Sequence, residues 1–171
     1  MSELLRIFTQ IALLRRGPQD LPASALLLAL SMVAYLCVNV LVSSLLPVNV
    51  WPGPVVVDTF FTLVWYIALL RFAGRRERTL QTATAVFGVQ TLLAPLLMLT
   101  EWLIPRVENG SPWQLPIASA GLLLLVWLIA ANSHVVKAAL EWSGTASVLL
   151  VILQVFAGQL LLVALFPPAT T

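Results

Sequence analysis

The chain has 171 residues, of which 60% are hydrophobic and only 9% charged, and its mean hydropathy is +0.99. One soluble core cannot bury that much apolar surface, so the composition excludes a soluble globular protein and predicts a membrane protein. The net charge of +2 comes from a few arginines at segment ends, which suits anionic lipid better than nucleic acid, and no nucleic-acid partner is expected. A lone cysteine, Cys37, excludes an internal disulfide framework.

Residues 1–17 predict an amphipathic helix lying on the membrane surface. Its apolar residues recur at helical spacing and comprise Leu4, Ile7, Phe8, Ile11 and Leu14. Gly17 and Pro18 end this helix. Pro22 is expected in the first turn of the next helix, with Asp20 close to its N-terminus.

Five apolar runs follow, each close to the ~20 residues that a helix needs to cross the hydrocarbon layer. They cover residues 22–46, 54–72, 80–104, 115–137 and 145–166. Turns rich in Pro and Gly separate them, and no loop is long enough to form a soluble domain. The sequence therefore predicts an all-α fold, with one transmembrane domain of five helices over residues 18–171.

Positive charge is distributed unevenly over the predicted loops. Eight of the nine Lys and Arg residues fall on one side of a five-span protein, and only Arg106 falls on the other. The eight are Arg6, Arg15, Arg16, Arg71, Arg75, Arg76, Arg78 and Lys137. The positive-inside rule then places the N-terminus in the cytoplasm and the C-terminus outside.

Polar and small side chains form a stripe along each of three spans. The stripes are Ser31, Tyr35, Asn39 and Ser43 in the first span, Thr84, Gly88, Thr91 and Pro95 in the third, and Ser143, Ser147, Gln154 and Gly158 in the fifth. In a structural interpretation they face the bundle interior, where interhelical hydrogen bonds contribute ~0.6 kcal/mol each. In a functional interpretation they line a polar path or a lipid-headgroup cavity.

The candidate intramembrane polar site consists of Asn39, Gln90, His134, Gln154 and Gln159. His134, the single histidine, is either a hydrogen-bonded or interfacial imidazole or a proton relay. Asp58 and Glu101 lie near the outer ends of their spans. They are either solvated carboxylates or a pair that acts as acid and base or holds a cation.

Sequence motifs of familiar membrane enzymes are missing. The chain contains no His-Glu-x-x-His, no Gly-x-Ser-x-Gly, no phosphate-binding loop and no dinucleotide-binding turn. We therefore expect a non-enzymatic protein, with no catalytic residue, no cofactor and no metal.

The run from Thr79 to Gly88, leading to Ala94 and Pro95, resembles the Yip1 family of small five-span membrane proteins, as does the stretch from Trp127 to His134. The resemblance covers about residues 54–166 and implies an architecture more than an activity. The Asp-Leu-Tyr-Gly-Pro element typical of eukaryotic members is missing, so their trafficking role and their Rab GTPase partners are not carried over. Short loops and a preference for Arg fit a bacterial inner-membrane relative.

These features favour a scaffold, an accessory subunit or a membrane organiser. The expected partners are membrane lipids, another membrane protein or a second copy of the chain. The candidate contact residues are Arg6, Arg15, Arg16, Arg75, Arg76 and Arg78. The alternative is a small oligomeric transporter or lipid-handling protein in which the polar stripes converge on a cavity.

Overall fold

The computed structural model describes residues 2–44, 52–108 and 110–167, excluding the side chains of Ser2 and Ser43. This part of the chain contains α1 (Ser2–Ala12), α2 (Ala25–Ser43), α3 (Gly53–Phe72), α4 (Thr79–Leu103), α5 (Gln114–Leu140) and α6 (Gly144–Leu165). Short 3-10 turns cover Pro18–Asp20 (η1), Arg76–Arg78 (η2) and Ile104–Arg106 (η3). The five helices from α2 to α6 are long and apolar enough to cross a membrane, which confirms the all-α fold with five candidate spans and a short N-terminal helix.

The first span begins later than expected, after a serine N-cap. α2 begins at Ala25 rather than at Pro22, because the Ser24 hydroxyl accepts a hydrogen bond from the backbone N–H of Leu27 at 3.3 Å. Asp20 does not act on α2 as expected, since its carboxylate accepts from the backbone N–H of Gly17 at 3.2 Å within η1. The expected end of this span, residues 45–46, lies outside the described residues.

The N-terminal helix is shorter than expected. α1 ends at Ala12, and Leu14 then takes the left-handed conformation, with φ 61°. The N–H of Arg15 bonds back to the carbonyl of Gln10 at 2.8 Å, the long-range bond of a common helix-ending motif. Gly17 and Pro18 therefore follow the end of α1 instead of forming it.

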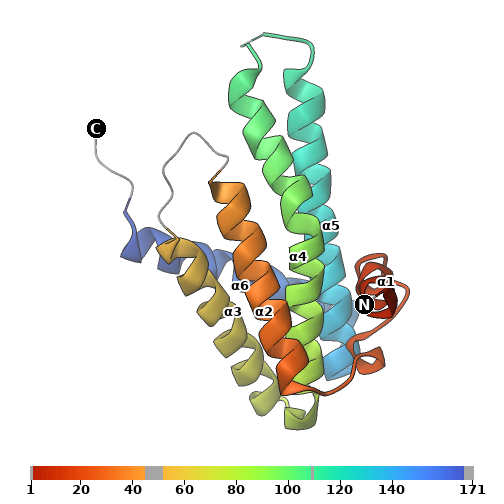
Figure 1. Ribbon diagram of the computed structural model, residues 1–171. Helices are drawn as coiled ribbons and strands as arrows, with labels where there is room; N and C mark the ends of the chain where they lie inside the picture. The colour runs from red at the N-terminus through yellow and green to blue at the C-terminus, as the bar shows by residue number, and fades with distance from the viewer. Residues whose placement is uncertain (1, 45–51, 109, 168–171) are drawn as a thin grey trace.

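α4 is the central helix of the bundle. It packs against α1, α2, α3 and α5, and every residue from Thr82 to Val89 is buried. Figure 1 shows α4 and α5 side by side, with their hairpin reaching beyond the end of α2. The small side chains of this buried run allow neighbouring helices to approach closely.

Protein covers part of the apolar face of α1. This helix lies against α4 and α5, with Ile11 and Ala12 buried (Figure 1). The Trp127 indole N–H donates to the carbonyl of Ala12 at 3.0 Å, and Nε2 of His134 lies 3.1 Å from the carbonyl oxygen of Arg16. The predicted amphipathic helix is thus docked on the bundle rather than covered by lipid alone.

The main hydrophobic core lies toward one end of the bundle. We call this the basic end, because it carries Arg71, Arg75, Arg76, Arg78 and Lys137. The largest core side chains are Tyr66 and Leu70 of α3, Val86 and Val89 of α4, Val135 and Val136 of α5, and Val151 of α6. In the opposite half of the bundle, polar side chains lie among the helices.

Candidate functional site: a polar cavity among the spans

A cavity of about 260 Å³ lies among α2, α3, α4, α5 and α6. Its polar lining comprises Tyr35, Asn39, Asp58, Thr62, Gln90, Glu101, Gln154 and Gln159. Asn39 lies near the end of α2, Asp58 near the start of α3 and Glu101 near the end of α4, so the cavity occupies the half of the bundle remote from the basic end.

The structure brings together four of the five residues of the candidate polar site. Asn39, Gln90, Gln154 and Gln159 lie on three different helices and line this one cavity, together with Asp58. His134 lies elsewhere, against the segment that follows α1. The candidate histidine is therefore part of the docking of α1 and not of the cavity.

Close helix packing holds the walls of the cavity in place. Gly158 of α6 faces Phe61 of α3, and a Cβ at Gly158 would lie 3.2 Å from Cε1 of that ring. The same Cβ would lie 3.8 Å from Oδ1 of Asp58. An alanine at position 158 would therefore press on the Phe61 ring and would be in ordinary van der Waals contact with Asp58.

Hydrogen bonds between helices connect the polar lining. The Tyr35 hydroxyl of α2 donates to Oδ2 of Asp58 in α3 at 2.8 Å. Deeper in the bundle, the Tyr66 hydroxyl donates to Oε1 of Gln154 at 2.8 Å, while Nε2 of Gln154 donates to the Thr62 hydroxyl at 3.4 Å. These bonds join α3 to both α2 and α6.

One amide oxygen of the lining, Oε1 of Gln90, is buried and accepts no hydrogen bond within the described part of the chain. Asn39 is 8% exposed and donates through Nδ2 to the carbonyl of Tyr35 at 2.8 Å. A buried acceptor left unpaired costs about 1–3 kcal/mol, so Oε1 of Gln90 would gain from a ligand that donates hydrogen bonds.

The apolar core closes the cavity on the side of the basic end. Beyond Tyr66 and Gln154, the next buried side chains of α3, α4 and α6 are Leu70, Val86 and Val151. A polar solute would have to open this packing to continue toward the basic end. The geometry is that of a binding pocket rather than an open channel.

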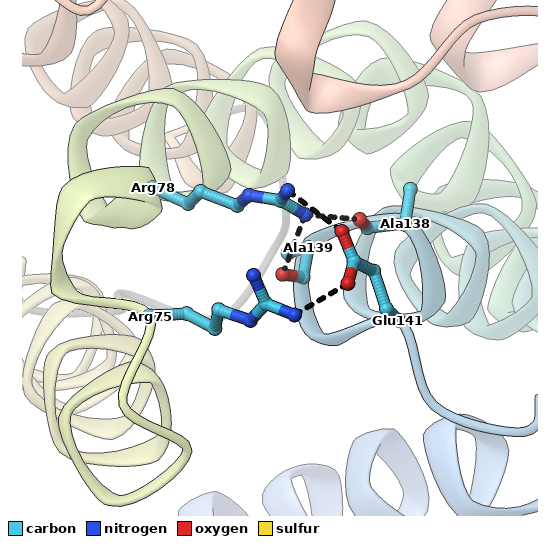
Figure 2. Close-up of polar contacts among 5 residues, drawn as sticks. All are labelled: Arg75, Arg78, Ala138, Ala139 and Glu141. Atoms are coloured by element: carbon cyan, nitrogen blue, oxygen red, sulfur yellow. Dashed lines mark hydrogen bonds and ion pairs between the residues drawn. The ribbon is translucent and has the colours of Figure 1, made fainter.

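An arginine clamp fixes the loop between α3 and α4 at the basic end (Figure 2). Arg75 and Arg78 both pair with Glu141, with an Nη2 to Oε1 distance of 2.7 Å for Arg78. Nη1 of Arg78 also donates to the carbonyls of Ala138 and Ala139 at 3.1 and 3.2 Å, at the C-terminal end of α5. The hydrogen bond from Arg78, together with the positive charge of both arginines, lowers the pKa of Glu141 below its ordinary value.

The clamp divides the arginines that were expected to contact lipid or a partner. Arg75 and Arg78 are engaged within the protein. The side chains of Arg6, Arg15, Arg16 and Arg76 are exposed and accessible to lipid or to another protein. The sequence could not separate the two groups, because all six arginines lie in loops or on the polar side of a helix.

A further polar stripe, not predicted from the sequence, lies on α3. Thr59, Thr62 and Tyr66 of α3 are all buried, at 2% exposure or less. Their spacing of three and four residues is the same signal that marked the other spans, so the pattern was present in the sequence.

The described residues contain no group of three or more His, Cys, Asp and Glu side chains that could hold a metal ion. No family model, no curated protein and no solved structure matches the chain. The resemblance to the Yip1 family stays a prediction. The five long apolar helices, with α4 at the centre, nevertheless make the chain a multi-span helical membrane protein by composition.

Proposed function

We propose that this protein binds a polar ligand in the cavity among its spans, as a small transporter or a lipid-handling protein. The observation that supports this proposal is the convergence of amide and carboxylate side chains from α2, α3, α4 and α6 on one cavity of about 260 Å³. Polar residues are costly within a bilayer, and their gathering at one place is typical of a binding site.

The hydrogen-bond pattern favours ligand binding over interhelical packing alone. Polar groups that only hold helices together are expected to bond to one another, as Tyr66 does with Gln154. Oε1 of Gln90 is instead buried without a donor among the described residues. A ligand in the cavity would supply the missing donor.

The closed core determines how transport would have to work. The apolar residues between the cavity and the basic end leave the pocket accessible from one side in this conformation. A transport cycle would therefore open the core around Leu70 and Val151, and five spans are few for a complete pathway, so a transporter would act as an oligomer. A lipid-handling protein needs no such opening.

The expected setting is a bacterial inner membrane, with the basic end in the cytoplasm. This placement is supported by the charge asymmetry and by the resemblance to the Yip1 family. Membrane lipid is then the most abundant source of ligands, and a second copy of the chain or another membrane protein is a further partner.

The exposed arginines favour a scaffold or membrane organiser as a second function. Arg6, Arg15, Arg16 and Arg76 would attract anionic lipid by ~1 kcal/mol each when they lie near its surface. Co-purification of one stoichiometric membrane protein would support this function. Loss of that protein on replacing Arg15 and Arg16 with Gln would assign the contact to the segment that follows α1.

The binding function is tested by identifying what the protein retains. The wild type, Asn39→Leu and Gln90→Leu are purified from native membranes in a mild detergent, and the retained lipids and small molecules are measured by mass spectrometry. Gln19→Leu is the matched control, because Gln19 is exposed and lies outside the cavity. The proposal predicts one molecule that the wild type and the control retain and that both cavity variants lose while they remain helical. Identical retention in all four proteins would refute it.

A further inference from the structure

We infer that the cavity binds a primary ammonium group, carried by an aminophospholipid headgroup or by a small soluble amine. Asp58 and Glu101 supply the negative charge, while Asn39 and Gln90 supply uncharged acceptors. This inference rests on the proposed function, since it names the chemical class of ligand that the same cavity takes.

The charge of the lining selects a cation. Among the described residues that line the cavity, the ionisable acids are Asp58 and Glu101, and the lining contains no Lys, Arg or His. Both ion pairs of the described residues lie at the basic end, where Glu141 pairs with Arg75 and Arg78. A ligand that presents only a phosphate or a carboxylate to the cavity would be repelled, whereas an ammonium group would give the two acids a counter-charge.

Asp58 is placed to hold that cation. Its Oδ2 accepts one hydrogen bond, from the neutral hydroxyl of Tyr35. Its Oδ1 lies beside Gly158, where the absence of a side chain brings α6 against the wall of the cavity. A carboxylate at this depth has several acceptor positions, and one hydroxyl fills only one of them. An ammonium group could bind Asp58 without breaking its bond to Tyr35.

The unpaired amide oxygen of Gln90 favours a primary ammonium over a quaternary one. A primary ammonium carries three N–H donors, which could reach Asp58, the unpaired Oε1 of Gln90 and the side-chain amide of Asn39, since all three residues line the cavity. A quaternary ammonium has no donor and is normally recognised by a cage of aromatic rings. Among the described residues of this lining the aromatic ones are Tyr35 and Phe61, and the Tyr35 hydroxyl is already bonded to Asp58.

The size of the cavity limits the ligand to a small group. Its volume of about 260 Å³ is below the range of roughly 300–1,000 Å³ that is typical of pockets for drug-sized molecules. The apolar lining residues Leu97, Met98 and Val155 suit a short hydrocarbon next to the amine. An ethanolamine headgroup and a short alkylamine both meet these limits.

The inference is tested with the full chain in nanodiscs, in two experiments that separate the sources of the amine. In the first, native mass spectrometry counts the lipids retained from mixtures of ethanolamine and choline phospholipids. In the second, the protein in choline-lipid nanodiscs is titrated with ethylamine and, as its quaternary counterpart, tetramethylammonium. We expect a preference for the primary amine of about tenfold or more, because hydrogen bonds to charged groups are the stronger ones.

Charge-removing variants assign the binding to the cavity. Asp58→Asn and Glu101→Gln should each weaken binding of the primary amine by about tenfold. Glu101 is exposed, so its variant tests the idea even if Asp58→Asn fails to fold. Glu77→Gln is the matched control, because Glu77 is an exposed acid of η2 outside the cavity, and its variant should bind like the wild type.

The outcomes separate this inference from the function on which it rests. Equal affinity for primary and quaternary amines would overturn the inference, as would retention in the cavity of a molecule that carries no primary amine. In those cases the cavity would still be a binding site. If the cavity variants retain and bind the same molecules as the wild type, both the inference and the proposed function fail.

Discussion

Gly88 determines how closely α1 approaches α4. A Cβ at this position would lie 2.3 Å from both Cδ1 and Cε1 of Phe8, and 3.0 Å from Cγ of the same ring. Real carbon contacts of this kind are longer, so the whole ring would have to move. The absence of a side chain at Gly88 is therefore what allows an aromatic residue of α1 to pack directly on the central helix.

The first prediction concerns this contact. Gly88→Ala should lower the free energy of unfolding by about 1–3 kcal/mol, because it overpacks the contact with Phe8. The loss should largely disappear in a Phe8→Ala background, where the added methyl group has room. Chemical unfolding in detergent micelles measures the free energy of unfolding in both backgrounds.

Gly144→Ala is the matched control for Gly88→Ala. Gly144 begins α6, and a Cβ added there would meet no atom within 4 Å, so its variant should be nearly neutral. An equal cost of Gly88→Ala with and without Phe8 would show that the ring contact does not limit the approach of α1.

Glu141 combines two roles in one residue. It ends α5 in the left-handed conformation, with φ 59°, and it accepts hydrogen bonds from Arg75 and Arg78 (Figure 2). Because the pKa of Glu141 is lower in the folded protein, its stabilising contribution is present above the ordinary pKa of 4.5 and is lost as the pH falls through the folded value.

The second prediction follows from the lowered pKa of Glu141. The thermal unfolding midpoint of the wild type should exceed that of Glu141→Gln at neutral pH, and the two should converge as the pH falls below 4.5. Differential scanning fluorimetry in detergent over this pH range provides the measurement. A gap that stays constant into acid would show that the carboxylate charge is not what stabilises the clamp, and Glu77→Gln should show no such convergence.

The position of α1 depends on its contacts with other helices. Two side chains of α5 bond to the chain where α1 ends: Trp127 to the carbonyl of Ala12 and His134 to that of Arg16. The last carbonyls of a helix lack partners within it, so the bond to Ala12 satisfies a group that would otherwise be costly next to lipid, and the bond to Arg16 holds the segment that follows α1. The amphipathic pattern predicted α1, but not its partner helices, because an apolar stripe fits lipid and protein equally well.

The third prediction tests this docking. Trp127→Phe keeps an aromatic ring but removes the N–H, so it should cost about 1 kcal/mol and loosen α1. Hydrogen exchange measured by mass spectrometry should rise in α1 and remain unchanged in the buried part of α4. Trp113→Phe, at the exposed start of α5, is the control. Unchanged exchange in α1 would show that the Trp127 hydrogen bond is not needed for the docking.

At the scale of the whole molecule, orientation in the membrane follows from charge. The clamp at Glu141 lies at the basic end of the bundle, and the cavity lies in the other half. If the basic end is cytoplasmic, the cavity takes its ligand from the outer half of the membrane or from the outer solution.

The fourth prediction tests that orientation. In a Cys37→Ser background, which removes the single native cysteine, Glu77→Cys and Glu108→Cys report the two ends of the bundle. A membrane-impermeant maleimide should label Cys at position 108 in intact bacterial cells, and should label position 77 only after permeabilisation. The reverse labelling would place the cavity on the cytoplasmic side.

The sequence by itself determined the all-α class, the number of long apolar helices and their limits to within a few residues, because hydrophobic length and turn residues are local properties. It also identified Asn39, Gln90, Gln154 and Gln159, since isolated amides within apolar runs stand out.

Only the tertiary structure decided that these four amides share a cavity with Asp58, that His134 does not, and that Arg75 and Arg78 are held by Glu141. The physical reason is that periodicity specifies the face of a helix, whereas the neighbour of that face depends on how all the helices pack together.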